Sequence, residues 1–274
     1  MPTHLGAMLK SPDIPNTDYR DAVLLDNPVG LWMLDEDFGT NVAVDLGSAG
    51  VNATYKGALT GAATRGVRSA FNISLAGCDS ADSGTSGNGF LGGVIEVPSS
   101  SAFVTEIGVV SGAMSYEWVS VKDYSVAASQ YWLKHYASGF APNVGPLSYI
   151  RESSDNTTSQ TQWQYQNTQG GNYSITGSSP TKQTAGVASH NVVTFDTGAN
   201  YLRWYRNNVR IMNWYQATAN KINGAAAPIY IGNLSSTSSN WPTYGAQGAI
   251  GGVAIYDYAL SASEVSDHYN ALLT

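Results

Sequence analysis

The chain has 274 residues, of which 43% are hydrophobic and 11% aromatic, so it is long enough to bury one large core. Only 12% of the residues are charged, and the net charge is −7 without any run of Lys or Arg. These features disfavour nucleic acid and anionic membranes as partners, because both attract proteins through a positive field.

Residues 1–18 are predicted to form an extended N-terminal arm. Pro2, Pro12 and Pro15 each remove a backbone donor and favour extended backbone. The segment lacks the basic start and apolar core of a secretory signal, and no later stretch has the ~18 apolar residues of a membrane span. We therefore expect a protein that is made in the cytoplasm and binds no membrane. Residues 19–274 are predicted to form one domain.

A short helix followed by strands is predicted after the arm. Asp18–Asp26 could form a helical turn, which Asn27 and Pro28 would end. From Val29 onward, short runs rich in β-branched and aromatic residues alternate with turn-forming clusters, which is typical of β structure. The predicted strands are Val29–Leu34, Val94–Val97, Met114–Lys122, Gln130–Tyr136, Leu147–Glu152, Thr161–Gln166, Val192–Thr197, Tyr201–Arg206, Val209–Trp214, Ile229–Gly232 and Ala249–Asp257.

One of these strands indicates how the others should pack. Met114, Tyr116 and Trp118 share one of its faces, and Ser115 and Glu117 share the other. This alternation is typical of a sheet with one buried and one solvated face. About eleven such strands without long helices between them predict an all-β fold made of two packed antiparallel sheets.

A tight hairpin is predicted between Tyr201–Arg206 and Val209–Trp214. The two residues between these strands are Asn207 and Asn208, and Asn tolerates the positive φ that both positions of a type I′ turn require. We therefore expect the two strands to pair directly with each other.

A C-terminal helix is predicted from its capping signals. Ser261 lies three residues before Glu264, which is the spacing of a capping box at a helix N-terminus. Val265, Tyr269 and Leu272 then fall on one face at helical spacing. We expect this helix to dock its apolar face on the sandwich.

Four segments share their features and their order with a known family. The opening segment Tyr19–Glu36 has a Trp and an acidic end, and Met114–Lys122 is a long strand that carries a Trp. Pro228–Asn233 and Gly248–Val265 provide closing strands followed by the capping box. Together these segments resemble the laminin-G-like, concanavalin A-like jelly-roll family. The resemblance implies a two-sheet antiparallel jelly-roll sandwich over residues 19–274.

Chains that join this opening to this ending resemble virion proteins of tailed bacteriophages, such as minor tail proteins and capsid decoration proteins. The resemblance implies a non-enzymatic structural protein of the virion, with residues 1–18 bound to other virion proteins. It further implies a homo-oligomer, with a trimer favoured, and a lectin-like sandwich that adheres to neutral host polysaccharide. The alternatives are a free carbohydrate-binding module of a bacterial surface system and, less favoured, a glycoside hydrolase.

The acidic residues give no support to the glycoside hydrolase alternative. Glucanases on a related sandwich use carboxylates on one strand in the pattern Glu-x-Asp-x-x-Glu. None of the six Glu starts that pattern, and the adjacent acids Asp35, Glu36 and Asp37 would alternate between opposite faces of a strand. We predict no catalytic residue and no enzymatic activity.

No metal or other cofactor is predicted. The histidines lack the spacing of a zinc site, and we expect each of them as a solvated imidazole at the surface. They are His4, His135, His190 and His268. A calcium ion would need clustered oxygen ligands; Asp79, Asp82 and Asp123 could converge, but no calcium-binding motif joins them.

The candidate carbohydrate-binding residues are four aromatic side chains. Trp163 and Tyr165 share one face of the predicted strand Thr161–Gln166, with glutamines on the other, so rings and amides there could hold a sugar. In the alternative interpretation the rings point into the core and the glutamines cover a solvated face. Trp241 and Tyr244 lie in a predicted loop, where a large aromatic side chain needs a packing partner or a ligand.

Overall fold

In the computed structural model, the described residues form two antiparallel sheets, a helix at each end of the described chain, and connecting turns. These residues are 17–36, 41–56, 65–68, 71, 73–77, 94–99, 113–122, 130–137, 144–152, 159–166, 172–179, 183–196, 201–215, 221–222, 227–232 and 248–274. The predicted all-β, two-sheet sandwich with a C-terminal helix is therefore confirmed. The predicted arm, residues 1–18, lies outside the described residues except for its last two.

Sheet A has eight strands in the order β14-β13-β12-β7-β17-β5-β4, and β1 pairs with β17 beside this path. Its strands are β1 (Gly30–Trp32), β4 (Arg65–Arg68), β5 (Ser74–Gly77), β7 (Met114–Lys122), β12 (Ala188–Asp196), β13 (Tyr201–Arg206), β14 (Val209–Tyr215) and β17 (Gly248–Tyr256). The sheet thus places strands from the middle and the end of the chain side by side, because β7 pairs with β17.

Sheet B has nine strands in the order β11-β10-β9-β8-β16-β6-β3-β2, and β15 pairs with β10 beside this path. Its strands are β2 (Val42–Ala43), β3 (Ala53–Lys56), β6 (Val94–Val97), β8 (Gln130–Ala137), β9 (Val144–Glu152), β10 (Ser159–Gln166), β11 (Asn172–Ser179), β15 (Lys221–Ile222) and β16 (Ile229–Ile231). Every strand predicted from the sequence has a counterpart in one of the two sheets.

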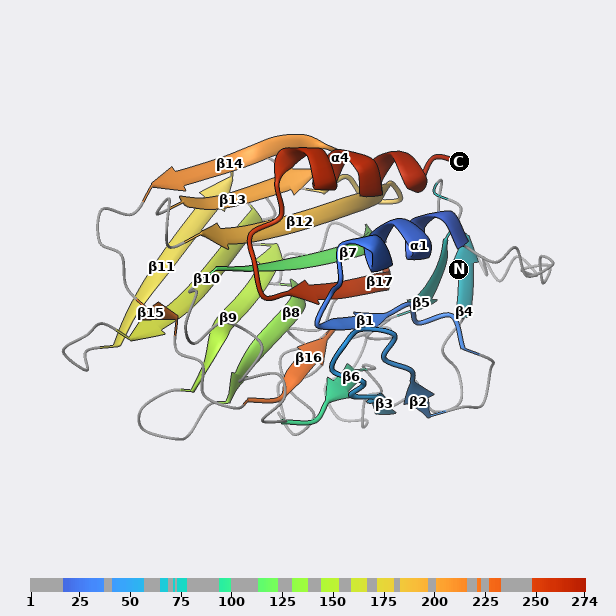
Figure 1. Ribbon diagram of the computed structural model, residues 1–274, viewed down its shortest axis with the longest axis horizontal. Coiled ribbons are helices and arrows are strands. Elements are labelled where there is room, and N and C mark those ends of the chain that lie inside the picture. The colour runs from blue at the N-terminus through green and yellow to red at the C-terminus, as the bar shows by residue number, and fades with distance from the viewer. Residues whose placement is uncertain are drawn as a thin grey trace, which may run out of the picture.

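The two helices lie side by side on the face of sheet A that is turned away from sheet B (Figure 1). They are α1 (Thr17–Leu25) and α4 (Ala262–Ala271). Beyond α4 the chain returns to the start of α1, where Thr274 Oγ1 donates to Asp18 Oδ2 over 3.3 Å. The described residues therefore form three layers: the helix pair, sheet A and sheet B.

Large apolar side chains fill the interior between the two sheets. Tyr116 and Trp118 of β7 meet Trp204 of β13 there, together with Leu133 from the opposite sheet. Tyr116 OH also lies 2.8 Å from His135 Nδ1, so a hydrogen bond joins the sheets through this interior. Because buried polar groups are stable only when they have partners, this bond favours one alignment of β7 over β8.

The other face of sheet A is also buried around β7, which differs from the sequence prediction. All of β7 is buried, including Ser115 and Glu117 on the face predicted to be solvated. Tyr19 and Val23 of α1 and Val265 of α4 cover this face. The predicted alternation is correct, but both sides of the strand are buried because the helices add a second layer.

The predicted hairpin between β13 and β14 is confirmed. Asn207 and Asn208 have φ values of 48° and 61°, the left-handed backbone that a two-residue type I′ turn requires. Asn207 Oδ1 also accepts a hydrogen bond from the backbone N–H of His190 over 2.8 Å, which attaches the turn to β12. The hairpin places β14 at the end of the strand order in sheet A.

Both predicted helices are confirmed. At the start of α4, Ser261 Oγ accepts from the Glu264 N–H over 3.2 Å, and Glu264 Oε2 accepts from the Ser261 N–H over 2.6 Å. These reciprocal bonds are the predicted capping box. Val265 and Leu272 are completely buried on the docking face of the helix. The predicted helical turn near Asp18 forms α1.

Candidate functional site

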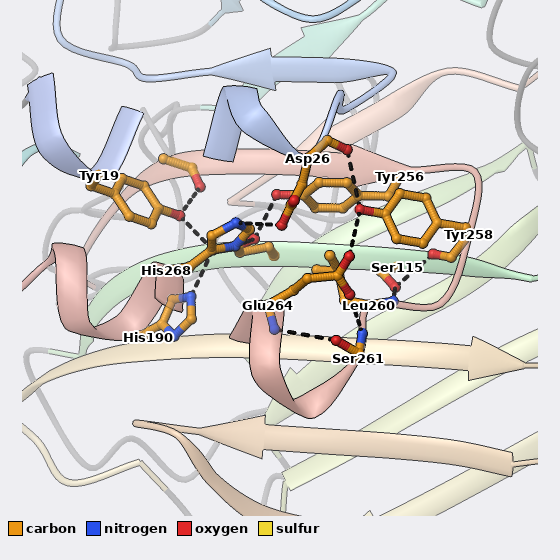
Figure 2. Close-up of polar contacts among 12 residues, drawn as sticks. Tyr19, Asp26, Ser115, His190, Tyr256, Tyr258, Leu260, Ser261, Glu264 and His268 are labelled. Atoms are coloured by element: carbon orange, nitrogen blue, oxygen red, sulfur yellow. Dashed lines mark hydrogen bonds and ion pairs between the residues drawn. The ribbon is translucent and has the colours of Figure 1, made fainter. Parts of the chain in front are cut away.

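The carboxylate of Glu117 is the centre of a buried polar cluster beneath the two helices. Figure 2 labels its four partners, which are Tyr19, His190, Tyr256 and His268. Tyr19 OH donates to its Oε1 over 2.9 Å, and His190 Nε2 lies 2.7 Å from the same oxygen. Tyr256 OH donates to Oε2 over 2.8 Å, and His268 Nδ1 lies 3.0 Å from Oε2. Each carboxylate oxygen therefore has one hydroxyl partner and one imidazole partner.

Five separate elements bring these groups together. β7 carries the carboxylate, and its two neighbours in sheet A, β12 and β17, supply His190 and Tyr256. The helices α1 and α4 supply Tyr19 and His268. The sheet therefore fixes half of the partners through strand pairing, and the docked helices provide the other half.

Asp26, directly after α1, extends the cluster on the other side of His268. His268 Nε2 lies 3.0 Å from Asp26 Oδ2, so the imidazole ring lies between two carboxylates. Burial by itself lowers the pKa of His268, but the charges of Glu117 and Asp26 outweigh burial and raise it to about 9. Burial would raise the pKa of Glu117, but His268 and His190 hold it far below its usual range. Glu117 and His268 thus form a buried ion pair at neutral pH.

Burial decides what this cluster can do. Glu117 is 0% exposed, and His190 and His268 are each 1% exposed. An imidazole beside a carboxylate has the groups of acid–base catalysis, but a substrate would have to displace a helix to reach them. A buried charge whose hydrogen bonds are satisfied instead connects the elements that carry the partners. The cluster is therefore a structural centre that attaches both helices to sheet A.

The prediction that the histidines lie solvated at the surface is wrong for three of them. His135, His190 and His268 are each 1% exposed. Each contacts a tyrosine hydroxyl or a carboxylate that lies far away in the sequence, so no local spacing pattern marks them. His4 lies outside the described residues.

A second group of polar contacts fixes the loop between β17 and α4 (Figure 2). Ser115 Oγ donates to the carbonyl oxygen of Tyr258 and accepts from the backbone N–H of Leu260, each over 2.9 Å. Tyr258 OH donates to the carbonyl oxygen of Asp26 over 3.1 Å. The strand that carries Glu117 therefore also holds the start of α4.

Several other carboxylates in the described part of the chain also serve the fold. Asp45, after β2, accepts from the N–H of Leu31 in β1 over 2.8 Å and from two N–H groups of the following turn over 2.8 and 2.7 Å. Glu36 accepts from the Val44 N–H over 2.7 Å, and Glu96 forms an ion pair with Lys56 over 2.8 Å. Each of these carboxylates stabilises a local turn or strand pair.

The four predicted carbohydrate-binding residues stay predictions. Trp163 and Tyr165 lie on β10, where Trp163 pairs with Leu147 of β9 and Tyr165 pairs with Tyr173 of β11. This backbone register places both residues one strand inside the end of sheet B. The remaining two, Trp241 and Tyr244, lie outside the described residues.

The suggested calcium ligands Asp79, Asp82 and Asp123 also lie outside the described residues. Within the residues that the structure does describe, no group of three or more His, Cys, Asp or Glu side chains is arranged to hold a metal ion. The described helices are too short or too polar to cross a membrane.

Two aromatic side chains of β14 are exposed, and one of them contacts a half-buried tyrosine of β13, at a place where no site was predicted. Tyr215 is 57% exposed, and its ring centroid lies 5.3 Å from that of Tyr201 at an interplanar angle of 58°. The guanidinium carbon of Arg203 lies 5.0 Å from the Tyr201 ring centroid. We refer to Tyr201, Arg203 and Tyr215 as the tyrosine–arginine surface. Its rings and guanidinium can offer stacking and hydrogen bonds to a ligand.

A β-bulge explains why the sequence does not predict this surface. The register of β13 and β14 shifts between Trp204 and Tyr205, so Tyr201 pairs with Tyr215. An unbroken two-residue hairpin would pair Tyr201 with Trp214 and would leave Tyr215 beyond the predicted strand. The shift changes the partner, and so the face of the sheet, of every β14 residue from Met212 to Tyr215.

Comparison with known proteins identifies the family. A sequence profile described as the Concanavalin A-like lectin/glucanases superfamily, Laminin_G_3, matches residues 109–266, which is more than half of the chain. The chain therefore belongs to this superfamily, and the predicted family resemblance is confirmed. No curated protein sequence matches the chain.

Solved structures with the same fold come from enzymes and from toxins. Domain 4 of an extracellular GH43 arabinanase from Geobacillus stearothermophilus, in complex with arabinotriose, has a TM-score of 0.53 and 14% identity, covering 89% of this chain and 98% of that one. Trypanosoma rangeli sialidase in complex with sialic acid has a TM-score of 0.52 and 13% identity, and the match covers 89% of this chain and 32% of the sialidase chain. Botulinum neurotoxin type C has a TM-score of 0.57 and 14% identity, and the match covers 91% of this chain and 52% of the neurotoxin chain. At these identities the likeness shows a shared fold, and this chain spans only part of the sialidase and neurotoxin chains.

Proposed function

We propose that the chain is a non-enzymatic carbohydrate-binding component of a tailed-bacteriophage virion, either a capsid decoration protein or a minor tail protein. One observation supports the binding function most directly: Tyr215 of the tyrosine–arginine surface is 57% exposed, whereas four glutamates bind partners within the fold, namely Glu36, Glu96, Glu117 and Glu264. The arabinanase domain of the same fold is in complex with arabinotriose. Flat rings beside hydrogen-bonding groups are well suited to hold a sugar.

The carboxylates favour binding over hydrolysis. Glycosidases need two carboxyl groups, about 5 to 9.5 Å apart, that a substrate can reach. Glu117 lies under the helices, Glu264 caps α4, and Glu36 and Glu96 contact local partners. A glycoside hydrolase is the less favoured alternative, and it is kept because the fold also occurs in chains of a sialidase.

The arrangement of the elements fits attachment at one end and display at the other. α1 begins at the right of Figure 1, whereas β14 ends, at Tyr215, on the left. Residues 1–16 are thus connected to the end opposite the tyrosine–arginine surface. We propose that they dock on other virion proteins and that the docked chains form a homo-oligomer, with a trimer favoured. A free carbohydrate-binding module of a bacterial surface system is the alternative.

A glycan array tests carbohydrate binding, and mass spectrometry of the incubated glycans tests hydrolysis. We expect the purified full chain to bind neutral glycans and to leave them intact after prolonged incubation. Shortened products would overturn the non-enzymatic part of the proposal. A chain that is folded but retains no glycan on the array would overturn carbohydrate binding.

Solution mass and particle sedimentation test the assembly. The full chain is compared with a chain that lacks residues 1–16; the deletion stops before Thr17 because Tyr19 donates to buried Glu117. We expect the full chain to oligomerise and to sediment with tailed-phage particles that lack this protein, and the shortened chain to do neither. If both forms are monomers that stay in the supernatant, the free module is favoured.

A further inference from the structure

We propose that the tyrosine–arginine surface is the saccharide site of the protein, and that it takes a neutral sugar ring stacked on Tyr215. The assignment rests on the carbohydrate-binding function proposed above and gives that function a location. This surface lies on sheet A, whereas the described candidates from the sequence, Trp163 and Tyr165, lie on sheet B.

The register of the hairpin gathers the surface on one face of sheet A. Tyr201 pairs with Tyr215, and Arg203 pairs with Asn213, so four side chains form two adjacent rows. Asn213 is exposed and offers both an amide donor and an amide acceptor. The rings can contact the apolar C–H face of a sugar while the guanidinium and amide bind its hydroxyl groups.

The surface is ordered by its own contacts although it is exposed. Tyr215 is more than half exposed, yet its ring contacts Tyr201, which in turn contacts the Arg203 guanidinium. Such contacts hold the rings in position without a ligand, which reduces the entropy that binding would cost. Exposed aromatic rings with neighbouring polar groups are also a common feature of binding surfaces.

Charge selects the class of saccharide. Arg203 Nη1 lies 4.0 Å from Asp196 Oδ2 on β12, so the positive charge of the surface has a negative neighbour. The whole chain carries a net charge of −7, which repels acidic polysaccharides. Neutral sugars such as those in arabinotriose, cellotriose and maltotriose therefore match this surface better than uronic or sialic acids.

The opposite face of β14 supplies a matched control. Trp214 is 47% exposed, but it pairs with buried Leu202, so it lies on the face of the sheet that is turned toward sheet B. Replacing Trp214 by Ala removes an exposed ring from the same strand without altering the tyrosine–arginine surface.

Isothermal titration calorimetry of full-chain variants with arabinotriose, cellotriose and maltotriose tests the site. We expect Tyr215→Ala to weaken binding about tenfold or more, because the stacked ring is lost. Tyr215→Phe keeps the ring and is expected to bind within about threefold of the unaltered chain. Asn213→Ala is expected to weaken binding about threefold, as it removes hydrogen bonds alone. Trp214→Ala is expected to bind like the unaltered chain.

The outcomes separate the site from the function. Unchanged binding in Tyr215→Ala, or equal losses in the Tyr215→Ala and Trp214→Ala variants, would overturn the site and leave the proposed function in place. Failure of the unaltered chain to bind any neutral saccharide, on the array or in solution, would overturn the function as well. Tighter binding of trigalacturonic acid than of cellotriose would overturn the neutral class. Thermal unfolding of each variant checks that the exposed substitutions leave the fold intact.

Discussion

His268 of the C-terminal helix and Glu117 of the central strand lie 3.0 Å apart, from Nδ1 to Oε2, and each is at most 1% exposed. The helix is therefore attached to the sandwich by a buried charge pair as well as by apolar packing. Since both members must be ionised for the pair to form, the stability of the fold should depend on pH in two directions.

The first prediction is that alkaline pH destabilises the protein. The pKa of His268 is raised from 6.5 to about 9, so its contribution is complete below about pH 6.5 and is lost as the pH rises through 9. The free energy of unfolding should fall by up to ~3 kcal/mol over this interval. Urea unfolding at pH 6 and pH 9 measures the change, and His268→Asn should remove most of the difference. Equal stability at both pH values would contradict this prediction.

The second prediction concerns the carboxylate itself. Glu117→Gln keeps the shape but removes the charge and puts an amide donor among four donor groups, so we expect a loss of ~3 kcal/mol at pH 6. NMR titration should also show the His268 pKa moving down, because its main favourable partner is neutral. Glu264→Gln is the control, since Gln also forms a capping box and stability should change by less than ~0.5 kcal/mol. Similar losses in both variants would contradict a special role of Glu117.

The third prediction compares two glycines with similar backbone conformations. Gly252 has φ +54°, and a Cβ there would lie 2.6 Å from Tyr19 Cε1; Gly50 has φ +61° and no atom within 4 Å of such a Cβ. Gly50→Ala should lose about 1 kcal/mol through backbone strain alone. Gly252→Ala should lose a further ~1–3 kcal/mol because the Tyr19 ring must move. Denaturant unfolding measures both, and equal losses would show that Tyr19 is not held tightly.

The fourth prediction concerns the turn between β13 and β14. Asn207 has φ 48° and accepts from the His190 N–H, so its backbone and its side chain are both used. Asn207→Gly retains the backbone conformation and should lose about 1 kcal/mol for the hydrogen bond. Asn207→Ala should lower the free energy of unfolding by ~2 kcal/mol, because Ala loses the hydrogen bond and is also strained in the left-handed backbone conformation. If the two variants are equally stable, the turn relaxes to another conformation.

For strands with strong apolar alternation, the sequence predicts the first and last residues correctly. The predicted strands Val94–Val97, Met114–Lys122 and Tyr201–Arg206 coincide with β6, β7 and β13. The capping box and the Asn turn were equally predictable, because each depends on side chains within a few residues of one another.

Strands formed mainly by backbone pairing could not be predicted in this way. β11 has the sequence NYSITGSS, with few apolar residues, yet it pairs with β10 over its full length. Strands β2 and β15 contain two residues each, too few for alternation to be recognised. In such strands the partner, rather than the local sequence, determines the structure.

The side chains of the buried cluster and of the tyrosine–arginine surface could not be predicted for a different reason. The burial of Glu117 depends on where two helices dock, and His190 and His268 reach it from distant segments. The tyrosine–arginine surface depends on a bulge that changes the partner of Tyr201 from Trp214 to Tyr215. Long-range docking and a one-residue register shift leave no local signal in the sequence.

The pairing of Glu117 with His268 also constrains the order in which the chain can finish folding. These residues are separated by 151 positions, so the ribosome adds Glu117 to the chain long before it adds His268. Until α4 has emerged, closing the outer face of sheet A would bury a charge without its main partner, which is strongly unfavourable. Translation that stops before His268 should therefore yield a chain whose outer face of sheet A stays open and sensitive to proteases. The domain can finish folding only after the C-terminal helix has been synthesised.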